Sequence, residues 1–196
     1  MRIYLIRHGE TDWNKELRLQ GREDIPLNEC GKEQAKACGA VLKGIKADVI
    51  VSSPLQRAKD TADIIREQMQ MKDICVDYDI IEREFGEASG ITYQEKMEKY
   101  GHGPIPGFES NESLNLRMKR AISKYSKRYP NGTVIMVSHG GCINSTISFL
   151  SNGELGTGKT RLKNASISVI EANEKEQRLI DYNLEASEFS KKYLMS

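Results

Sequence analysis

Cationic side chains follow three short β-branched runs in this 196-residue sequence. Arg7 and His8 come after the first run, Arg57 lies one helical turn beyond the second, and His139 comes after the third. If the runs are parallel strands, their carboxyl ends meet at one rim of a sheet, where ligands bind in such folds. Cations gathered at that rim repel one another unless an anion lies among them. Because a guanidinium group suits phosphate oxygens, the pattern predicts a phosphoryl pocket.

A histidine in such a pocket can do covalent chemistry. Neutral imidazole is a nucleophile that can accept a phosphoryl group, and neighbouring cations stabilise the charge on the phosphoryl oxygens during the transfer. The leaving oxygen then needs a proton, which a carboxylic acid can supply. A single histidine after a strand is more often structural than catalytic. The hypothesis therefore depends on the coincidence of all three segments.

The elements that must position these groups follow from the periodicity of apolar residues. Short apolar runs bounded by polar residues or glycine predict strands, and the longer stretches between them have apolar residues at helical spacing. Pro54 opens one of these helices at a position where the first turn tolerates proline. The expected strands are residues 2–7, 47–53, 74–78, 133–139, 166–172 and 178–183, and the expected helices are residues 31–42, 54–69 and 113–129.

Strands that alternate with helices indicate a sheet covered on both faces. We therefore expect an α/β protein, a three-layer α/β/α sandwich with a mostly parallel central sheet. No repeat, low-complexity segment or linker divides the chain, so a single domain is expected over residues 1–196. The least regular stretch contains GHGPIPGFESNE, and it predicts a short lid or cap at about residues 86–112, across the mouth of the site.

Composition and charge argue against several classes of protein. The 29 Lys+Arg against 28 Asp+Glu give no reason to expect nucleic acid or an anionic membrane as a partner. The longest apolar runs are far shorter than the ~20 residues of a membrane span, and Arg7 interrupts the first run too early for a signal peptide. The four cysteines form no CxxC pair and are interpreted as reduced thiols. We expect a cytoplasmic protein.

Residues 5–11 read LIRHGET and are followed by Asp12-Trp13-Asn14. Together with further stretches in the same order, this segment resembles the histidine phosphatase superfamily, in its phosphoglycerate mutase-like branch. The likeness covers nearly the whole chain. The further stretches are Leu19-Gln20-Gly21, residues 26–35, residues 52–62, Glu82 with Phe85-Gly86 and Gly90, Glu112-Ser113-Leu114, and residues 137–141.

The resemblance implies a role for each residue that matches these motifs. It makes His8 the phosphorylated nucleophile and Glu82 the proton donor and later the base. It implies no metal and no cofactor, and a turnover in two steps, formation of a phosphohistidine and its hydrolysis by water. The residues implied to bind the transferring phosphoryl group are Arg7, Arg57 and His139, and those implied to line the phosphate or substrate site are Thr11, Asn14, Gln20, Gly21 and Gly140.

Other features of the sequence have a plainer interpretation. The stretch from Gly86 to Gly90 lacks the aromatic residue that many relatives carry there. Cys142 has no base of its own and is interpreted as a small residue that packs a helix. His102 is interpreted as a loop residue.

Residues 153–160 read GELGTGKT, a literal match to the phosphate-binding pattern G-x-x-x-x-G-K-T. A true P-loop follows a buried strand and opens a helix, so that backbone amides surround the phosphates. Here a helical-looking stretch precedes the match, and a loop and a strand follow it. A flexible surface loop is therefore favoured, and a P-loop nucleotide-binding protein is the remote alternative.

Among the activities of the branch, hydrolysis of a small phosphomonoester is favoured over the phosphoglycerate mutase reaction. A mutase must hold a carboxylated, doubly phosphorylated intermediate and exclude water, which calls for extra cations and a longer closing segment. Between residues 86 and 107 the chain has two lysines against three glutamates. A binding module with an inactive site is disfavoured because the set of motif residues is complete. The expected partner is a small phosphorylated metabolite. Its identity, the conformation of the lid and the oligomeric state, a homodimer included, stay open.

Overall fold

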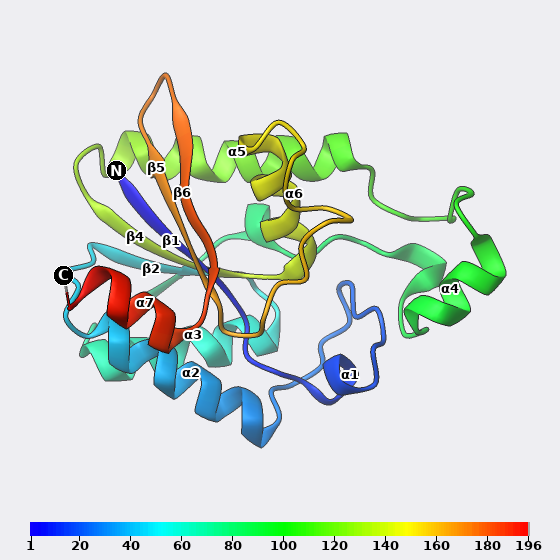
Figure 1. The fold of residues 1–196 in the computed structure, drawn as a ribbon, viewed down its shortest axis with the longest axis horizontal. Coiled ribbons are helices and arrows are strands. Elements are labelled where there is room, and N and C mark those ends of the chain that lie inside the picture. Colours follow the sequence, from blue (N-terminus) through cyan, green and yellow to red (C-terminus); the bar gives the residue numbers. More distant parts are fainter. Residues whose placement is uncertain (196) are drawn as a thin grey trace.

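The computed structural model describes residues 1–195, so residue 196, the last of the expected domain, lies outside the described residues. Within this range, six strands form one sheet with the order β3-β2-β4-β1-β5-β6 (Figure 1). The strands are β1 (Arg2–Arg7), β2 (Val49–Ser52), β3 (Ile74–Val76), β4 (Thr133–Ser138), β5 (Ile167–Ala172) and β6 (Gln177–Leu184). The helices are α1 (Asp12–Lys15), α2 (Glu29–Leu42), α3 (Gln56–Met69), α4 (Tyr93–Tyr100), α5 (Asn111–Arg128), α6 (Gly140–Leu150) and α7 (Ala186–Tyr193), with 3₁₀ turns η1 (Tyr78–Ile80) and η2 (Gly86–Ala88).

The sheet is mostly parallel, as the alternation of strands and helices predicts. β3, β2, β4 and β1 pair in parallel, whereas β5 pairs antiparallel with β1, and β6 pairs antiparallel with β5. The two antiparallel strands are joined by a short turn without a crossover helix, which is the connection that antiparallel neighbours permit. The α/β fold class is confirmed.

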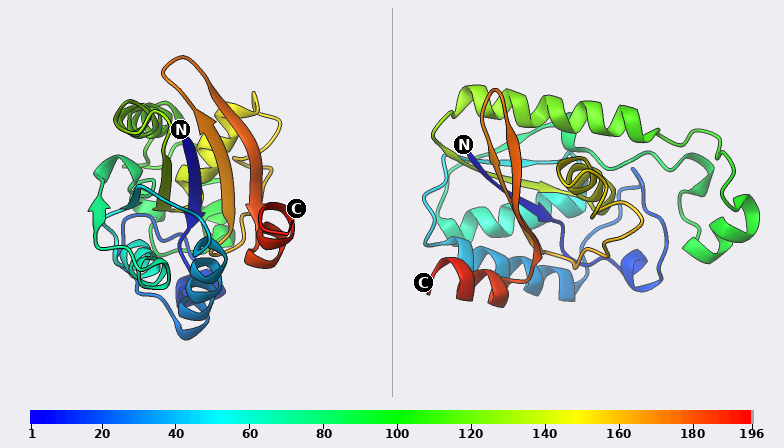
Figure 2. Two further views of the ribbon diagram at one scale, coloured as in Figure 1. Left: turned by 90° about the vertical axis from the view of Figure 1, so that its left-hand side faces the viewer. Right: turned by 45° about the horizontal axis from the view of Figure 1, so that its top comes forward.

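Helices cover both faces of the sheet and make a three-layer sandwich (Figure 2). α5 and α6 pack on one face, where Leu114 and Met118 of α5 meet Leu5 and Met136 of the strands. α2, α3 and α7 pack on the other face. Successive residues of a strand point to opposite faces, so continuous apolar strands such as RIYLIR contribute to both cores.

The carboxyl ends of the three central strands lie at one level. In the parallel register Arg7 pairs with Ser138, and Ser52 pairs with Val137. The next residues leave the sheet together, since the backbone N–H of His8 donates to the Ser138 carbonyl at 3.0 Å. The register therefore brings His8, Ser53 and His139 to the same rim.

The segment expected as an irregular lid contains a helix. α4 projects away from the sandwich (Figure 1), and none of its residues is buried. Its start is stabilised by a capping box, in which Thr92 and Glu95 satisfy each other's backbone N–H groups. Tyr93, Met97 and Tyr100 do stand at helical spacing, but the helix is only eight residues long and this stripe reaches no core. The expectation of an irregular segment was therefore wrong for these residues.

The GELGTGKT segment lies in a surface turn between α6 and β5. A helix precedes it rather than a strand, and no helix begins at its C-terminal end. The Lys159 ammonium donates to the Gly153 carbonyl at 2.6 Å in an exposed position. The geometry is therefore not that of a P-loop. Over the described part of the chain, no helix has both the length and the apolar composition that crossing a membrane requires.

Candidate active site

A cavity of about 150 Å³ lies at the carboxyl ends of the central strands. Its deep wall carries two arginines, a histidine and a carboxylate, and its outer wall comes from the segment after α1. Most of the residues expected in the site therefore meet in one place. The lining residues are Arg7, His8, Asn14, Arg18, Leu19, Gln20, Gly21, Arg57, Glu82, Phe85 and Gly140.

The His8 ring is buried and held in one tautomer. Its Nδ1 lies 2.7 Å from the Gly9 carbonyl oxygen, which can only accept, so Nδ1 carries the proton. Burial, followed by the charges of Arg57 and Arg7, lowers the pKa of His8 well below the ordinary 6.5. The ring is therefore neutral, and the lone pair on Nε2 is available.

Arg57 places its guanidinium beside that nitrogen. The side chain is fully buried, and its Nε donates to His8 Nε2 at 3.3 Å. Its two other nitrogens donate to the carbonyl oxygens of Glu23, at 2.6 Å, and Gly21, at 2.8 Å. These hydrogen bonds hold the guanidinium group of Arg57 beside the His8 ring.

Arg7 adds a second buried cation. Its Nη1 donates to the Leu162 carbonyl at 2.5 Å, whereas its buried Nε has no hydrogen-bond partner within the described chain. Burial lowers the pKa of Arg7 to about 10, so the group stays charged at neutral pH. A buried donor without a partner is costly, and an anionic ligand in the cavity would satisfy it.

His139 lies beneath the cavity rather than in its lining. Its ring centroid is 5.2 Å from that of His8, and its Nε2 lies 2.7 Å from Ser53 Oγ. The opposite nitrogen, Nδ1, is buried without a partner in the described residues. Burial and then the charge of Arg57 lower the pKa of His139 well below 6.5, so this ring is neutral as well.

Glu82 presents its carboxylate to the first turn of α6. Oε2 accepts from the Gly141 N–H at 3.0 Å, and Oε1 accepts from the N–H groups of Cys142, at 3.2 Å, and Arg83, at 2.7 Å. A Cβ atom at Gly141 would lie 2.6 Å from Oε1. A larger residue at this position would therefore displace the carboxylate from the helix. The Cys142 thiol donates to the Ile81 carbonyl at 2.8 Å, which agrees with its interpretation as a packing residue.

Four of the five expected substrate-binding residues line the cavity. They are Asn14, Gln20, Gly21 and Gly140. The buried Gln20 Oε1 has no partner in the described chain, so one polar atom of the outer wall is available to a ligand. Thr11, the fifth, does not line the cavity. It caps α1 and donates to Asn14 Oδ1 at 3.1 Å.

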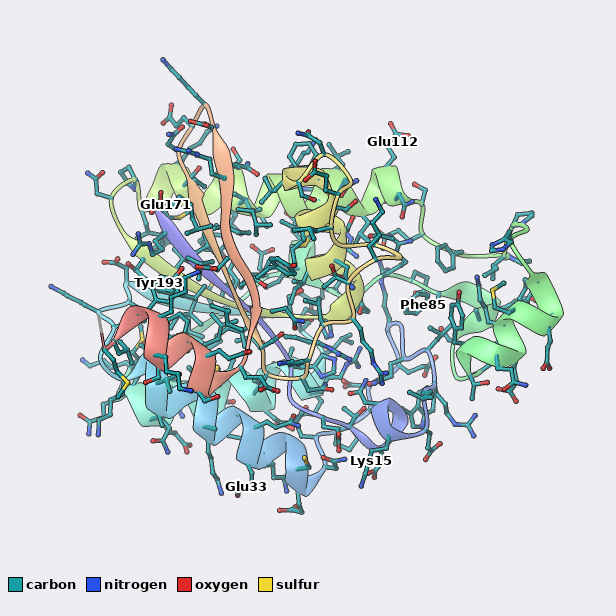
Figure 3. The ribbon with its side chains drawn as sticks, in the orientation of Figure 1. Lys15, Glu33, Phe85, Glu112, Glu171 and Tyr193 are labelled. Atoms are coloured by element: carbon teal, nitrogen blue, oxygen red, sulfur yellow. The ribbon has the colours of Figure 1, made fainter. Side chains whose placement is uncertain are left out.

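Sequence reasoning missed three residues of the lining, Arg18, Leu19 and Phe85. Phe85, labelled in Figure 3, lies where the chain leaves the sandwich toward α4. Its signal in the sequence is an aromatic residue within a polar stretch that follows the expected acid. Asn164 was also missed, although its Nδ2 donates to the His8 carbonyl at 3.2 Å, and no local pattern marks it.

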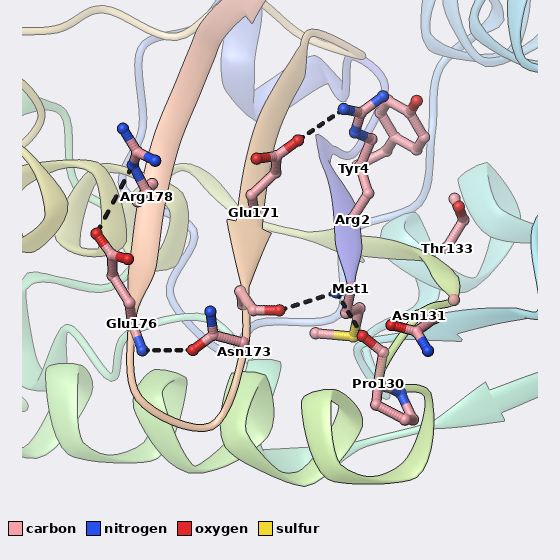
Figure 4. A pocket seen from close by; sticks show the side chains of 12 residues that line it. Met1, Arg2, Tyr4, Pro130, Asn131, Thr133, Glu171, Asn173, Glu176 and Arg178 are labelled. Atoms are coloured by element: carbon pink, nitrogen blue, oxygen red, sulfur yellow. Dashed lines mark hydrogen bonds and ion pairs between the residues drawn. The ribbon is translucent and has the colours of Figure 1, made fainter.

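A second hollow, of about 580 Å³, lies at the amino-terminal end of β1 (Figure 4). Its charged groups pair with one another, as in the contact of Arg2 with Glu171 at 2.6 Å. The terminal ammonium of Met1 donates to the carbonyl oxygens of Pro130 and Ala172. The charged groups of this hollow therefore have partners, in contrast to the Nε of Arg7 in the cavity at His8.

Comparisons with known proteins identify relatives of this arrangement. The family model of the histidine phosphatase superfamily (branch 1) matches residues 3–185. The chain is 40% identical over 182 residues to the uncharacterized phosphatase PhoE of Bacillus subtilis (strain 168), which covers 93% of this chain and 94% of that protein. It is 34% identical over 188 residues to the probable phosphoglycerate mutase GpmB of Salmonella typhi, with 89% and 86% covered. Among solved structures, the phosphoserine phosphatase of Entamoeba histolytica in complex with 3-phosphoglyceric acid has a TM-score of 0.80 and 31% identity, with 93% of this chain and 96% of that chain covered.

Proposed function

The chain belongs to the histidine phosphatase superfamily, and from that premise we propose that it hydrolyses a small phosphomonoester through a phosphohistidine on His8. The observation that carries the proposal is the state of the His8 ring. Its proton is held on Nδ1 by the Gly9 carbonyl, and its burial keeps it neutral. Nε2 therefore carries the lone pair that attack on phosphorus needs, once the Arg57 Nε that donates to it turns to the substrate.

The buried cations suit the other atoms of the phosphoryl group. The Nε of Arg57, which donates to His8 Nε2 in the empty cavity, can donate to a phosphoryl oxygen once the substrate binds. The unpartnered Nε of Arg7 and Nδ1 of His139 are two further polar atoms within this site. Fixed donors around the transferring group stabilise its charge without reorganisation during the reaction.

Glu82 moves the proton in both steps. First, Nε2 forms a bond to phosphorus as the bond from phosphorus to the alcohol oxygen breaks, and Glu82 gives its proton to that oxygen. Then Glu82 takes a proton from water, whose oxygen bonds to phosphorus as the N–P bond breaks. Inorganic phosphate leaves, and both residues return to their starting states.

The substrate class proposed is a small phosphorylated metabolite. A cavity of about 150 Å³ has room for a phosphoryl group with a small alcohol. The name of the E. histolytica relative, a phosphoserine phosphatase, is consistent with such a substrate.

The phosphoglycerate mutase reaction is the second candidate, because GpmB is named a probable mutase. The lid argues against it. Lys99 lies 3.7 Å from Glu87, Lys96 contacts the Gly101 carbonyl at 3.5 Å, and neither lysine lines the cavity. The lid therefore supplies no cation to hold the carboxylate of a phosphoglycerate.

The proposal includes activity without a metal ion. Three arginines, Arg7, Arg18 and Arg57, supply the positive charge that lines the cavity, and within residues 1–195 no three His, Cys, Asp or Glu side chains gather as a metal site. Assays in EDTA should therefore give the same rate of phosphate release from an aryl phosphate as assays with added Mg²⁺.

Rapid quench with a ³²P-labelled phosphomonoester, run in EDTA, tests the mechanism. Wild-type protein should yield an acid-labile, base-stable phosphoenzyme, and His8→Ala should yield none and retain almost no turnover. Circular dichroism of His8→Ala provides the control for folding. Labelling of His8→Ala, or activity lost in EDTA and restored by Mg²⁺ or Zn²⁺, would contradict the proposal.

A pair of leaving groups tests the role of Glu82. An alkoxide needs a proton to leave, whereas a nitrophenolate hardly does. Glu82→Gln should therefore lose on the order of 10²-fold in kcat/KM on glycerol 2-phosphate and distinctly less on p-nitrophenyl phosphate, because kcat/KM reports the step in which the leaving group departs. An equal loss on both substrates would remove Glu82 from the role of acid.

A further inference from the structure

We propose that Arg117 and Glu109 are positioning residues for the proton donor Glu82, an inference that rests on the function proposed above. Neither residue lines the cavity. Both side chains are nearly enclosed, with 9% of Arg117 and 8% of Glu109 exposed. Because this ion pair is buried, its role follows from the groups that Arg117 contacts.

Arg117 holds the backbone that leads to Glu82. Its Nη1 donates to the Asp79 carbonyl at 2.9 Å and also to the Ile81 carbonyl. Glu82 follows η1 and belongs to no strand or helix, so no ladder of backbone hydrogen bonds fixes its place. The two neighbouring carbonyls are also held by side chains, Ile80 O by Ser138 Oγ at 2.8 Å and Glu82 O by Arg22 Nε at 3.2 Å.

Glu109 orients Arg117. Its two carboxylate oxygens accept from Nε at 2.7 Å and from Nη2 at 2.9 Å, a bidentate arrangement that leaves Nη1 directed at the carbonyls before Glu82. Burial alone would raise the pKa of Glu109, but the hydrogen bond and charge of Arg117 lower it below the ordinary value. The pair therefore stays ionised at neutral pH.

Glu109 also joins this support to the lid. It is the residue at which the chain returns from α4 to α5, and its backbone N–H donates to the Glu84 carbonyl at 2.8 Å. Its Oε2 accepts from the Glu84 N–H at 3.3 Å. The backbone at Glu82 is thus held by Arg117 on the side before it and by the base of the lid on the side after it.

The consequence for catalysis is selective. Proton transfer requires the carboxyl to lie within about 2.6–3.2 Å of the leaving oxygen, whereas attack by His8 does not depend on Glu82. A misplaced Glu82 therefore slows formation of the phosphohistidine only where the leaving group needs a proton, whereas hydrolysis of the phosphohistidine, which also uses Glu82, is slowed equally for every substrate. A purely structural role for Arg117 would instead lower stability, or would lower both rates by the same factor.

The test measures kcat/KM of Arg117→Met on the two phosphate esters used for Glu82, because this constant reports the steps up to formation of the phosphohistidine. We expect a loss of about tenfold or more on glycerol 2-phosphate and of less than about threefold on p-nitrophenyl phosphate. Arg120→Met is the matched control, because Arg120 lies on the same helix and pairs with the Asp79 carboxylate, but is 61% exposed and touches none of the carbonyls. Its ratio of the two rates should equal that of the wild type.

Two further variants keep the outcomes distinct. Arg117→Lys retains a charge beside Glu109 with fewer fixed donors, and it decides the question if Arg117→Met does not fold. Arg117→Met added to Glu82→Gln should cause no further leaving-group-dependent loss, because the two changes remove one function. If Glu82→Gln shows the dependence and neither Arg117 variant does, the positioning role is wrong while the proposed function stands. If the loss in Glu82→Gln does not depend on the leaving group, Glu82 is not the proton donor, and the positioning role of Arg117 is wrong with it.

Discussion

Two histidine rings lie side by side in the site, and both are kept neutral. Burial removes the water that would solvate an imidazolium, and the nearby arginines repel a further positive charge. For His8 this state is the one that the proposed function requires, because a protonated Nε2 has no lone pair. The arginines therefore help to keep the ring neutral before any substrate binds.

The same shifts predict how stability depends on pH. Both histidines have folded-state pKa values well below 6.5, so below about pH 6.5 the unfolded chain binds protons that the folded chain does not. Stability is therefore lost as the pH falls. Between about pH 6.5 and 5.5 the free energy of unfolding should fall by about 1 kcal/mol for each of the two rings. Urea unfolding at a series of pH values measures this loss.

His8→Asn and His139→Asn are the controls for this pH dependence. Each should remove about half of the loss between pH 6.5 and 5.5, because one titrating ring remains. If the free energy of unfolding falls equally with pH in the wild type and in both variants, the two rings are protonated in the folded protein.

At the scale of elements, the loop after β1 is held against the start of α2 by two glycines. A Cβ atom at Gly9 would lie 2.3 Å from the Gly31 carbonyl oxygen, and one at Gly31 would lie 2.1 Å from the Glu10 carbonyl oxygen. The backbones touch, and the Asn28 N–H donates to Glu10 O at 3.0 Å. This contact sets the direction in which the chain leaves His8.

Gly31→Ala should therefore damage the site through the fold. Alanine in a helix is favoured over glycine by about 1 kcal/mol, but the clash with Glu10 opposes this gain. Overpacking typically costs about 1–3 kcal/mol, and a contact of 2.1 Å with backbone lies at the upper end of that range. We expect a net loss of stability in urea unfolding together with a lower kcat, since the loop that carries His8 must shift.

Gly44→Ala is the matched control for this prediction. The nearest atom to its added Cβ would be Leu194 Cδ2, at 4.0 Å, so the space is open. Its stability should stay within about 0.5 kcal/mol of the wild type. Equal effects of the two substitutions would mean that the contact between Gly31 and Glu10 does not restrain the loop.

At the scale of the whole molecule, the segment between Phe85 and Phe108 leaves the sandwich as a projection. The two rings pack at a centroid distance of 5.5 Å at the base of the lid, and α4 projects beyond them without a buried residue. No lysine of this segment lines the cavity. Under the proposed function, such a lid favours hydrolysis over return of the phosphoryl group to a second substrate.

We predict that release of phosphate exceeds isomerisation of 3-phosphoglycerate to 2-phosphoglycerate by at least roughly a hundredfold, a difference in barrier of about 2.7 kcal/mol. A coupled assay for 2-phosphoglycerate, with a bisphosphorylated primer present, measures the second rate beside phosphate release. Isomerisation faster than phosphate release would identify a mutase.

The sequence by itself determined the fold class and most of the lining of the cavity. The spacing of apolar residues that identifies a strand or a helix lies within a single segment. Runs such as RIYLIR and TVIMVS therefore indicate buried strands even when the neighbouring strands are unknown. Since parallel strands align their carboxyl ends, the side chains that follow them meet. Arg7, His8 and Arg57 were found in this way, whereas the role of Glu82 depended on the resemblance to a family.

Only the tertiary structure decided which polar atoms are satisfied and which are left for a ligand. The pairing of His139 with Ser53, the support of Glu82 by Arg117, and the contact of Gly31 with Glu10 join residues far apart in the chain. No spacing in the sequence predicts such contacts, because they depend on the register of the strands and on how the helices pack. α4 was not predicted because it is only eight residues long, so its three apolar residues at helical spacing are too few to stand out in the sequence.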